Sequence, residues 1–590
     1  MSRNRFASLF LGLALILPAP AFAQDQAADA IQPETTTATA ETRVEPVKAK
    51  SRMVAAANPL AAEAGLAILK KGGNAIDAMV TTQLVLGLVE PQSSGLGGGA
   101  FLVFFDARAG KLTTFDGRET APEAVDPTLF LDQAGDPLSF FDAVVGGRSV
   151  GTPGTVRLLY ETHRQRGALD WKTVVEPAID LARQGFEVSP RLHALIAEDG
   201  ERLKRFAATR DYFFDDAGTP LKVGTLLKNE PYAETLERIA EEGAAGFYEG
   251  PVAEAIVATV QGAEGNPGRL SLSDLAGYRI VERAPVCITY RAYDVCGMGP
   301  PSSGALTVGQ ILGLIEPFDI KALGPNSPEA WRLIGNASRL AFADRGRYMA
   351  DIDYVPMPMR GLLDEDYLTS RSELLKGEEA LPADQVEPGS PPWDHAMLLG
   401  DDTAIEMPST SHFSIADAAG NVVSMTTTIE NGFGSRLMTN GFLLNNELTD
   451  FSFETHDENG HVIANAVAPG KRPRSSMAPT IVMQEGKPVL AIGSPGGSRI
   501  IGYVAQALIA IIDWDMNVQE AAAMPHLVNR FGTFDIEAET DATSLSDPLR
   551  ELGFAIEERD LNSGIHAIAI TPDGLEGGAD PRREGIAVGE

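Results

Sequence analysis

The sequence predicts a large globular protein of the α+β class. Apolar residues make up 44% of its 590 residues and charged residues 22%, which provides enough apolar material for a large core and too little charge for a disordered chain. Patterns typical of helices and of strands both occur along the chain. A helix-rich middle part, from about 150 to 400, is followed by a last third in which strand patterns return.

The N-terminal segment is typical of an export signal. Two arginines precede an apolar stretch over 6–17, and Ala21-Phe22-Ala23 matches a signal-peptidase site. About 12 apolar residues are too few for a membrane-spanning helix, which needs roughly 20. We therefore expect residues 1–23 to be removed after export, with no membrane anchor. Residues 24–50 are rich in Ala, Thr, Glu and Pro and are predicted to form a flexible leader.

The domain is predicted to begin with two helices and a strand pair. Asn58 and Pro59 suit the start of a helix, Gly72 suits its end, and Asn74 suits the start of a second, strongly apolar helix. A turn at Ala109-Gly110 separates two runs with strand character. The predicted ranges are 59–71 and 75–90 for the helices, and 100–106 and 111–116 for the strands.

A disulfide-linked hairpin is predicted over 285–298, a segment rich in Tyr, Val, Ile and Thr. If Arg291 and Ala292 form the turn, outward counting places Cys287 opposite Cys296. At the non-hydrogen-bonded site expected there, the two Cα atoms lie about 4.5 Å apart, within disulfide range. Since the chain is expected to be exported, we predict a structural disulfide. The alternative is two buried thiols in adjacent strands.

Composition and motifs argue against several functions. Asp and Glu number 81 and Lys and Arg 48, and the net charge of −33 argues against a nucleic acid or an anionic membrane as partner. The glycine-rich bend over 94–100 matches G-x-G-x-x-A, but it follows a helix and precedes a strand, the reverse of the dinucleotide-binding order. No H-E-x-x-H pair and no G-x-S-x-G elbow occurs. We expect no metal and no organic cofactor.

Two strands near the start of the last third bring threonines together. They are predicted over 413–417 and 422–429. With a four-residue loop between them, outward counting places Thr428 opposite Ser411, one residue from Thr410. Two hydroxyls are then expected to converge where a strand starts. Threonine is a common strand residue, so this pattern alone does not identify a site.

Eight motifs in a fixed order carry a resemblance to a known family. They are PQSSGLGGGAF (91–101), DGRETAP (116–122), TSHFS (410–414), TTTIENGFG (426–434), LLNNELTDFS (443–452), KRPRSSMAPT (471–480), GSPGGSRI (493–500) and GADPRR (578–583). With these motifs the chain resembles the bacterial γ-glutamyltransferases, members of the N-terminal nucleophile hydrolases, over 51–590. The resemblance implies a four-layer αββα sandwich. It also implies self-cleavage between Ser409 and Thr410 into a large subunit, 51–409, and a small catalytic subunit, 410–590, which stay together as a heterodimer.

The resemblance gives Thr410 the role of nucleophile. Its hydroxyl would attack the Ser409 carbonyl of the precursor, and cleavage would free an α-amine beside the same hydroxyl. An α-amine has a pKa of about 7.7 to 8.0, so it can act as the general base near neutral pH. Thr428 is expected to hydrogen-bond the Thr410 hydroxyl. No cofactor is implied.

The same resemblance implies a pocket for an amino-acid head group. Arg118 would pair with the substrate α-carboxylate, because a planar guanidinium matches a carboxylate. The hydroxyls of Ser475 and Ser476 would assist it. Glu447 and Asp450 would bind the α-ammonium.

Two glycines and one further acid complete the expected site. Gly496 and Gly497 lie between a predicted strand over 488–493 and a helix predicted to begin near Arg499, so their N–H groups can form an oxyanion hole. Glu430 stands at a position where some family members have Asn in contact with the ammonium and others have Glu. It is expected to bind substrate as well.

The resemblance therefore implies an exported, autoprocessing enzyme, expected in the periplasm. It would cleave glutathione and other γ-glutamyl compounds and transfer the glutamyl group to water or to amino-acid or peptide amines. Three alternatives stay open: a related acylase that removes glutaryl-type side chains, an exported solute-binding protein for acidic amino acids, and a precursor that is cut but catalytically silent.

Overall fold

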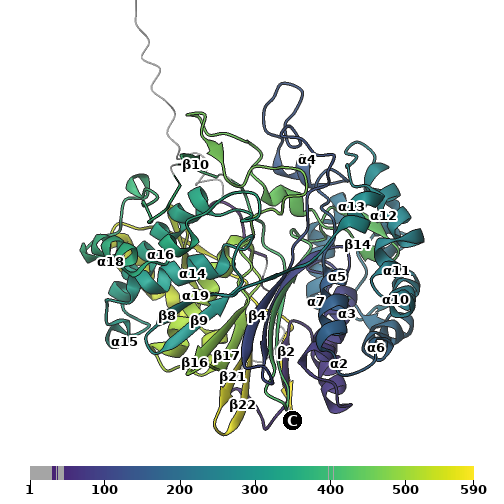
Figure 1. The fold of residues 1–590 in the computed structure, drawn as a ribbon, viewed down its shortest axis with the longest axis horizontal. Coiled ribbons are helices and arrows are strands. Elements are labelled where there is room, and N and C mark those ends of the chain that lie inside the picture. The colour runs from purple at the N-terminus through teal and green to yellow at the C-terminus, as the bar shows by residue number, and fades with distance from the viewer. Residues whose placement is uncertain (1–28, 35, 37–44, 396, 403) are drawn as a thin grey trace, which may run out of the picture.

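The computed structural model describes residues 29–34, 36, 45–395, 397–402 and 404–590. Two seven-stranded antiparallel sheets lie face to face at its centre, and helices cover the outer face of each sheet (Figure 1). This is the four-layer αββα sandwich that the resemblance implies, so the predicted fold class is confirmed.

Each sheet combines strands from both sides of residue 410. The first sheet contains, in order across it, β1 (Val47–Ala49), β22 (Gly574–Ala579), β21 (His566–Thr571), β17 (Lys487–Gly493), β16 (Thr480–Gln484), β9 (Tyr293–Gly297) and β8 (Val286–Tyr290). The second contains β23 (Ile586–Gly589), β2 (Met53–Ala56), β11 (Ser411–Ala416), β12 (Val422–Thr428), β3 (Gly99–Asp106), β4 (Lys111–Gly117) and β7 (Val281–Arg283).

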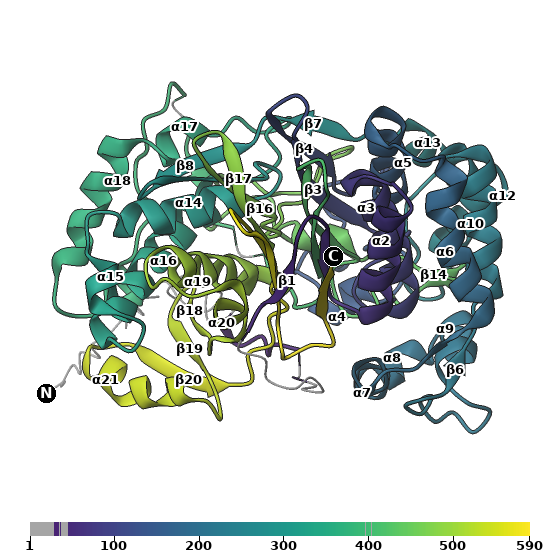
Figure 2. The same cartoon turned by 90° about the horizontal axis from the view of Figure 1, so that it is seen from below.

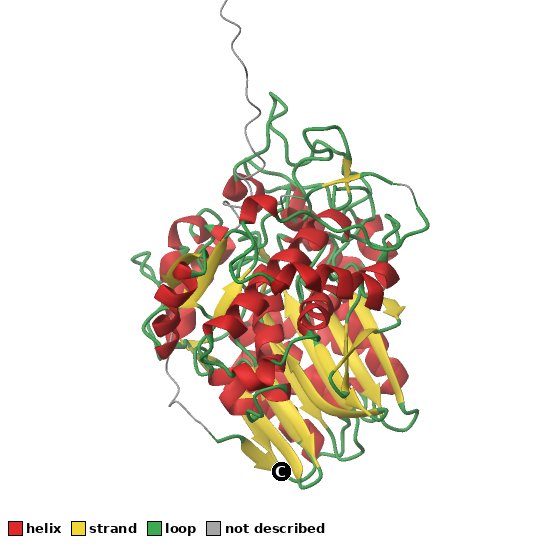
Figure 3. Cartoon of the chain, turned by 90° about the vertical axis from the view of Figure 1, so that its left-hand side faces the viewer, coloured by secondary structure: helices red, strands yellow, loops and turns green. Residues whose placement is uncertain are grey.

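Helices form the two outer layers. On the side of the second sheet lie α2 (Pro59–Lys70), α3 (Ala75–Val89), α5 (Thr155–Arg166) and α6 (Trp171–Gln184), and on the side of the first sheet lie α14 (Gly304–Ile315), α16 (Pro328–Tyr348), α19 (Ile500–Ile512) and α20 (Val518–Ala523). Figure 2 shows the two helical layers from below, and in Figure 3 the second group lies in front of the strands. Among the described residues, no helix combines the length and the apolar character that crossing a membrane requires.

The predicted first elements are present. The Asn58 side chain caps α2 by accepting a hydrogen bond from the Leu60 N–H, and the helix ends one residue earlier than predicted. Asn74 forms a capping box with Asp77 at the start of α3, which is buried along its whole length, as its apolar sequence indicates. The strands β3 and β4 match the predicted pair to within one residue at each end.

The register of β11 and β12 differs from the prediction by one residue. The prediction placed Thr428 opposite Ser411, but Ser411 pairs with Thr427. The loop between the strands has five residues rather than four, because the carboxylate of Asp417 at its start accepts hydrogen bonds from two N–H groups within the loop. Thr428 therefore lies level with Thr410 itself.

The cysteine hairpin has the expected register. In β8 and β9, Tyr290 lies opposite Tyr293 and Cys287 opposite Cys296. A disulfide joins the two cysteines, whose Cα atoms are 4.1 Å apart. Since β8 is the last strand of the first sheet, the bond fastens an edge strand to its neighbour.

Removing this disulfide is expected to destabilise the protein moderately. The double substitution Cys287→Ser and Cys296→Ser should lower the free energy of unfolding by about 2–4 kcal/mol, because the cross-link restricts the unfolded chain. Denaturant unfolding of the variant and of the oxidised wild type measures this difference. Thiol titration of the denatured, unreduced wild type should find no free thiol, and two free thiols would contradict the disulfide.

Part of the segment expected to be a flexible leader has a defined structure. The predicted signal peptide, 1–23, lies outside the described residues, but β1 falls within 24–50 and pairs with β22. Glu34 is buried and forms ion pairs with Arg191 at 2.5 Å and with Arg583 at 3.2 Å. For these residues the expectation of flexibility is wrong, because partners distant in the sequence hold them.

Candidate active site

The two threonines that were predicted to converge lie side by side at the ends of neighbouring strands. Thr410 directly precedes β11, and Thr428 is the last residue of β12. The Thr410 hydroxyl donates a hydrogen bond to Thr428 Oγ1 over 3.3 Å. Thr428 Oγ1 also accepts the Glu430 N–H over 2.8 Å. These contacts fix the direction of the Thr410 hydroxyl.

The backbone at Thr410 is strained. Its φ is +127°, and a β-branched residue rarely adopts positive φ. The Ser409 hydroxyl donates to the Gln92 carbonyl over 3.1 Å, and Arg583 donates to the Thr410 carbonyl over 3.2 Å. Residues on both sides of the 409–410 peptide bond are therefore held in place, and the strain lies at the bond that was predicted to be cut.

A small cavity lies beside Thr410. Its lining residues are Arg118, Glu406, Met407, Thr410, Thr428, Glu430, Glu447, Asp450, Ser475, Ser476, Met477, Gly497 and Ile500. Of the predicted site residues, Ser409 and Gly496 are absent from this lining, and each is the chain neighbour of a residue in it. Within the described part of the chain, no three His, Cys, Asp or Glu side chains are grouped so that they could hold a metal ion.

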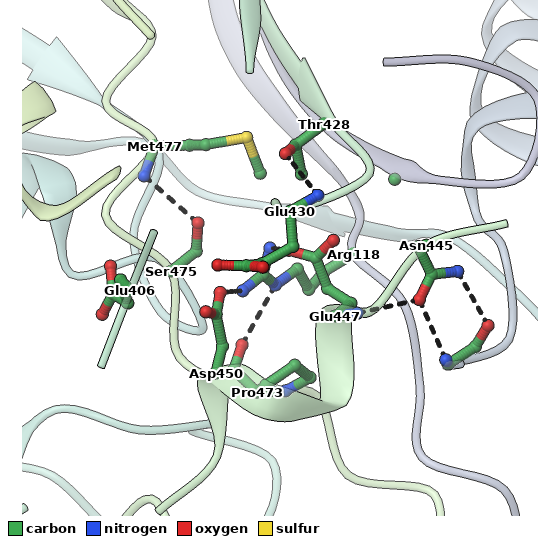
Figure 4. A network of polar contacts seen from close by, with 12 residues as sticks. Arg118, Glu406, Thr428, Glu430, Asn445, Glu447, Asp450, Pro473, Ser475 and Met477 are labelled. Atoms are coloured by element: carbon green, nitrogen blue, oxygen red, sulfur yellow. Dashed lines mark hydrogen bonds and ion pairs between the residues drawn. The ribbon is translucent and has the colours of Figure 1, made fainter. Parts of the chain in front are cut away.

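Arg118 lies at the centre of the charged groups (Figure 4). It follows β4 and is completely buried. Its guanidinium forms ion pairs with Glu447 and Asp450 and donates to the carbonyls of Pro473 at 3.1 Å and Arg474 at 2.8 Å. The resemblance implied that the cation and the acids bind opposite ends of a substrate. In the uncut chain they bind one another.

The buried acids near Arg118 outnumber the charge that it can neutralise. Glu430, Glu447 and Asp450 line the cavity, and Glu119 is buried near Glu447. Burial, reinforced by the charge of Glu447, raises the pKa of Glu430 to about 8 and that of Glu119 well above its ordinary value. Burial also raises the pKa values of Glu447 and Asp450 in spite of Arg118, and each has one carboxylate oxygen without a hydrogen-bond partner among the described residues. A bound cation would let these acids ionise, so the site suits an ammonium group.

The serines lie on the side of the cavity where the chain before residue 410 enters. Ser475 Oγ accepts a backbone N–H over 3.1 Å, and the Ser476 hydroxyl donates to the Glu406 carboxylate. Glu406 and Met407 thus line the site, although the sequence did not point to them. Their segment carries no motif, so no local signal could have found them.

The two glycines connect β17 to the short helix η4 (Gly497–Arg499). Their φ values are +133° for Gly496 and +59° for Gly497. A Cβ at Gly496 would lie 2.7 Å from the Tyr503 ring, and one at Gly497 would lie 2.5 Å from the Met407 carbonyl oxygen. Both the backbone conformation and the lack of space therefore require glycine at these positions.

Comparison with known proteins identifies the family. The family model for gamma-glutamyltranspeptidase matches residues 61–590. The chain belongs to the gamma-glutamyltranspeptidase family. The recognition based on the eight sequence motifs is thereby confirmed.

Proteins with different names are similar to this chain. The glutathione hydrolase proenzyme of Bacillus subtilis (strain 168) is 36% identical over 552 residues, 92% of each chain. The acylase ACY 1 proenzyme of Pseudomonas sp. (strain V22) is 34% identical over 92% of this chain and 94% of its own. The crystal structure of cephalosporin acylase from Bacillus halodurans has a TM-score of 0.81 and 28% identity, and the match covers 94% of this chain and 98% of that one.

This member of the gamma-glutamyltranspeptidase family is an enzyme of the N-terminal nucleophile hydrolase type, and a threonine nucleophile is typical of the family. Its relatives are named both as glutathione hydrolases and as acylases. Family membership therefore leaves the acyl group to be inferred from the charges of the cavity.

Proposed function

We propose that the chain is a precursor that cuts itself between Ser409 and Thr410 and then acts as a γ-glutamyltransferase and glutathione hydrolase. The position of Thr410 carries the proposal: its strained backbone leads into β11, its hydroxyl meets Thr428, and a charged cavity opens beside it. The names of similar proteins, glutathione hydrolase proenzymes, support it.

The first reaction is self-cleavage. Thr410 Oγ1 attacks the carbonyl carbon of Ser409, the C–N bond breaks, and the Thr410 nitrogen takes up the hydroxyl proton. The resulting ester is hydrolysed by water, which leaves a carboxylate on Ser409 and a free α-amine on Thr410. Loss of the positive-φ strain favours this step. The large subunit, 51–409 with the leader 24–50 before it, and the small subunit, 410–590, stay together as a heterodimer.

Turnover uses the new amine as the general base. The α-amine takes the proton of the Thr410 hydroxyl, and the oxygen attacks the γ-carbonyl carbon of the donor. The N–H groups of Gly496 and Gly497 stabilise the oxyanion, and losing one such donor typically slows a reaction by about 10² to 10³. The proton passes to the departing amine. Water, or the amine of an amino acid or peptide, then resolves the glutamyl ester.

A γ-glutamyl donor such as glutathione presents a carboxylate and an ammonium, and the cavity offers partners for both. Arg118 with the hydroxyls of Ser475 and Ser476 suits the carboxylate. Glu447 and Asp450, each with one unpartnered oxygen among the described residues, suit the ammonium. Binding a zwitterion lets the acids exchange part of their contact with Arg118 for contact with the ligand.

The acids also separate this function from that of a glutaryl-type acylase. A glutaryl group lacks the ammonium, so it brings no additional cation to the buried acids. Rates with γ-glutamyl-p-nitroanilide and glutaryl-p-nitroanilide provide the test. We expect kcat/KM to be at least tenfold higher for the γ-glutamyl compound, and a preference for the glutaryl compound would make the protein an acylase.

Export is part of the proposal. We expect the N-terminal sequence of the large fragment to begin at Gln24, after removal of residues 1–23, and the enzyme to be recovered from the periplasm. N-terminal sequencing of the large fragment tests the first expectation, and cell fractionation with a cytoplasmic marker protein tests the second. An intact N-terminus in the cytoplasmic fraction would contradict export and leave the catalytic proposal unaffected.

Substrate affinity should depend on the ionisation of Glu430. Its pKa of about 8 means that the carboxyl is mostly protonated at pH 6 and gains its negative charge as the pH rises to 8. The inhibition constant of L-glutamate, which keeps its ammonium proton over this range, should therefore fall by about tenfold or more from pH 6 to pH 8. In Glu430→Gln this pH dependence should be lost. Equal inhibition of the wild type at both pH values would exclude this role.

A further inference from the structure

Two buried arginines beside the cavity, Arg345 of α16 and Arg474, hold a carboxylate that belongs to the chain itself. Arg345 forms an ion pair with one oxygen of Glu406, and Arg474 Nε lies 3.6 Å from the same oxygen. The other oxygen accepts a hydrogen bond from the Ser476 hydroxyl, which itself accepts one from Arg345 over 2.7 Å. Two cations and a hydroxyl thus surround the carboxylate.

This environment favours an anion. Burial alone raises the pKa of Glu406, but the guanidinium groups of Arg345 and Arg474 and the Ser476 hydroxyl outweigh burial and hold that pKa below its ordinary value. Arg345 is 3% exposed and Arg474 is 1% exposed. Removing Glu406 would leave buried positive charge that needs another partner.

The place of Glu406 in the sequence relates it to a substrate. During self-cleavage the chain that ends at Ser409 becomes the acyl group on Thr410, as the glutamyl group does during turnover. The residues just before Ser409 therefore occupy the acyl pocket of the uncut chain. Met407 agrees with this, because its N–H donates over 2.9 Å to Glu430, an acid expected to bind the substrate ammonium.

Cutting removes the covalent link between Thr410 and the segment that carries Glu406. It also creates a new carboxylate at Ser409, next to a cavity that already contains an excess of buried acids. Because like charges repel, this carboxylate favours withdrawal of the segment from the cavity. Once Glu406 withdraws, Arg474 retains Asp402 at 2.8 Å. Of these two acids, only Asp402 then remains to balance the guanidinium groups of the two buried arginines. A second carboxylate, from a ligand, can therefore bind them.

We propose that Arg345 and Arg474, together with Ser476, bind the carboxylate of the acyl group in the cut enzyme, at the place that Glu406 occupies in the uncut chain. This inference rests on the proposed function in one respect, the role of Thr410 as acyl acceptor. It extends the carboxylate subsite beyond Arg118 to two further cations. This subsite recognises the anionic end of the acyl group, which γ-glutamyl and glutaryl groups share.

Three chromogenic anilides separate the charges of the acyl group. γ-Glutamyl-p-nitroanilide has the carboxylate and the ammonium, the glutaryl compound has only the carboxylate, and the 4-aminobutyryl compound has only the ammonium. In Arg474→Gln, checked to be cut into two chains, KM should rise at least tenfold for the first two, with kcat changed less than threefold. KM for the 4-aminobutyryl compound should stay within twofold.

A matched control lies on the same helix as Arg345. Arg332 of α16 is 2% exposed and pairs with Glu329 at 2.7 Å. Arg332→Gln should leave all three KM values unchanged. If Arg474→Gln does not fold, Arg474→Lys replaces it, since a lysine keeps the charge but not the planar guanidinium. It should raise KM for the two carboxylate-bearing compounds at least threefold.

The outcomes separate this inference from the proposed function. Suppose that the wild type turns over the γ-glutamyl compound. If the Arg474 variant then has an unchanged KM, or equal KM increases for all three compounds, the carboxylate subsite alone is overturned. A wild type that prefers the glutaryl compound would overturn the γ-glutamyl function, while a selective KM increase in the variant would still support the subsite. A wild type that stays uncut would overturn both.

Discussion

Thr410→Ala is expected to yield a single uncut chain with no measurable turnover. Without the hydroxyl neither the Ser409 carbonyl nor a substrate can be attacked, and the loss in kcat should reach at least about 10⁴. A denaturing gel should show two chains for the wild type and one for the variant. The small wild-type fragment should begin Thr-Ser-His-Phe.

Thr410→Ser is the matched control, because it retains the hydroxyl and should still be cut. An uncut wild type would contradict the enzymatic proposal and favour the solute-binding alternative. A wild type that is cut but releases no p-nitroaniline from either the γ-glutamyl or the glutaryl compound would favour the silent precursor. The gel and the rate assay together separate these cases.

Arg118→Gln is expected to impair both stability and activity. It leaves Glu447 and Asp450 buried without their cation, which typically costs about 3–5 kcal/mol. Loss of a buried charge pair with the substrate carboxylate should lower kcat/KM by about 10² to 10³. Urea unfolding in the uncut Thr410→Ala background measures the first effect, because only one chain then unfolds. Rates of the cut enzyme measure the second.

Arg183→Gln provides the comparison for a surface ion pair. Arg183 is paired with Glu230 at 3.1 Å and Glu237 at 2.7 Å, but its side chain is 40% exposed. Its loss should leave the free energy of unfolding and the rates nearly unchanged, because solvent screens an exposed ion pair. Equal stability of the Arg118 and Arg183 variants would contradict the buried ion pairs described for Arg118.

The sequence predicts the elements whose signals are local. Asn58 and Asn74 mark the helix starts because capping involves residues within one turn. The pairing of Cys287 with Cys296 follows from a two-residue turn and the two-residue period of strands. The motifs that gather Arg118 and its acid partners in one cavity were recognised by resemblance, since nothing local connects segments so distant in the chain.

The sequence predictions are wrong or incomplete where contacts between residues distant in the chain determine the structure. The register at Thr428 depends on Asp417, whose carboxylate gathers one more residue into the loop than a simple turn would have. Glu34 lies in a segment with the composition of a flexible leader, yet buried arginines hold it. Glu406 has no motif, and its importance follows only from where the folded chain brings it.

The arrangement of strands around residue 410 governs how the cut enzyme persists. In the second sheet β11 and β12 lie between β2 and β3, and in the first sheet β16, β17, β21 and β22 lie between β1 and β9. The fragments cannot part unless both sheets come apart. The precursor folds as one molecule, but the denatured fragments must meet again in a second-order reaction. We therefore expect the lifetime of the cut heterodimer to depend on the rate of unfolding and not on dilution. Once unfolded, the two fragments should rarely regain the active structure.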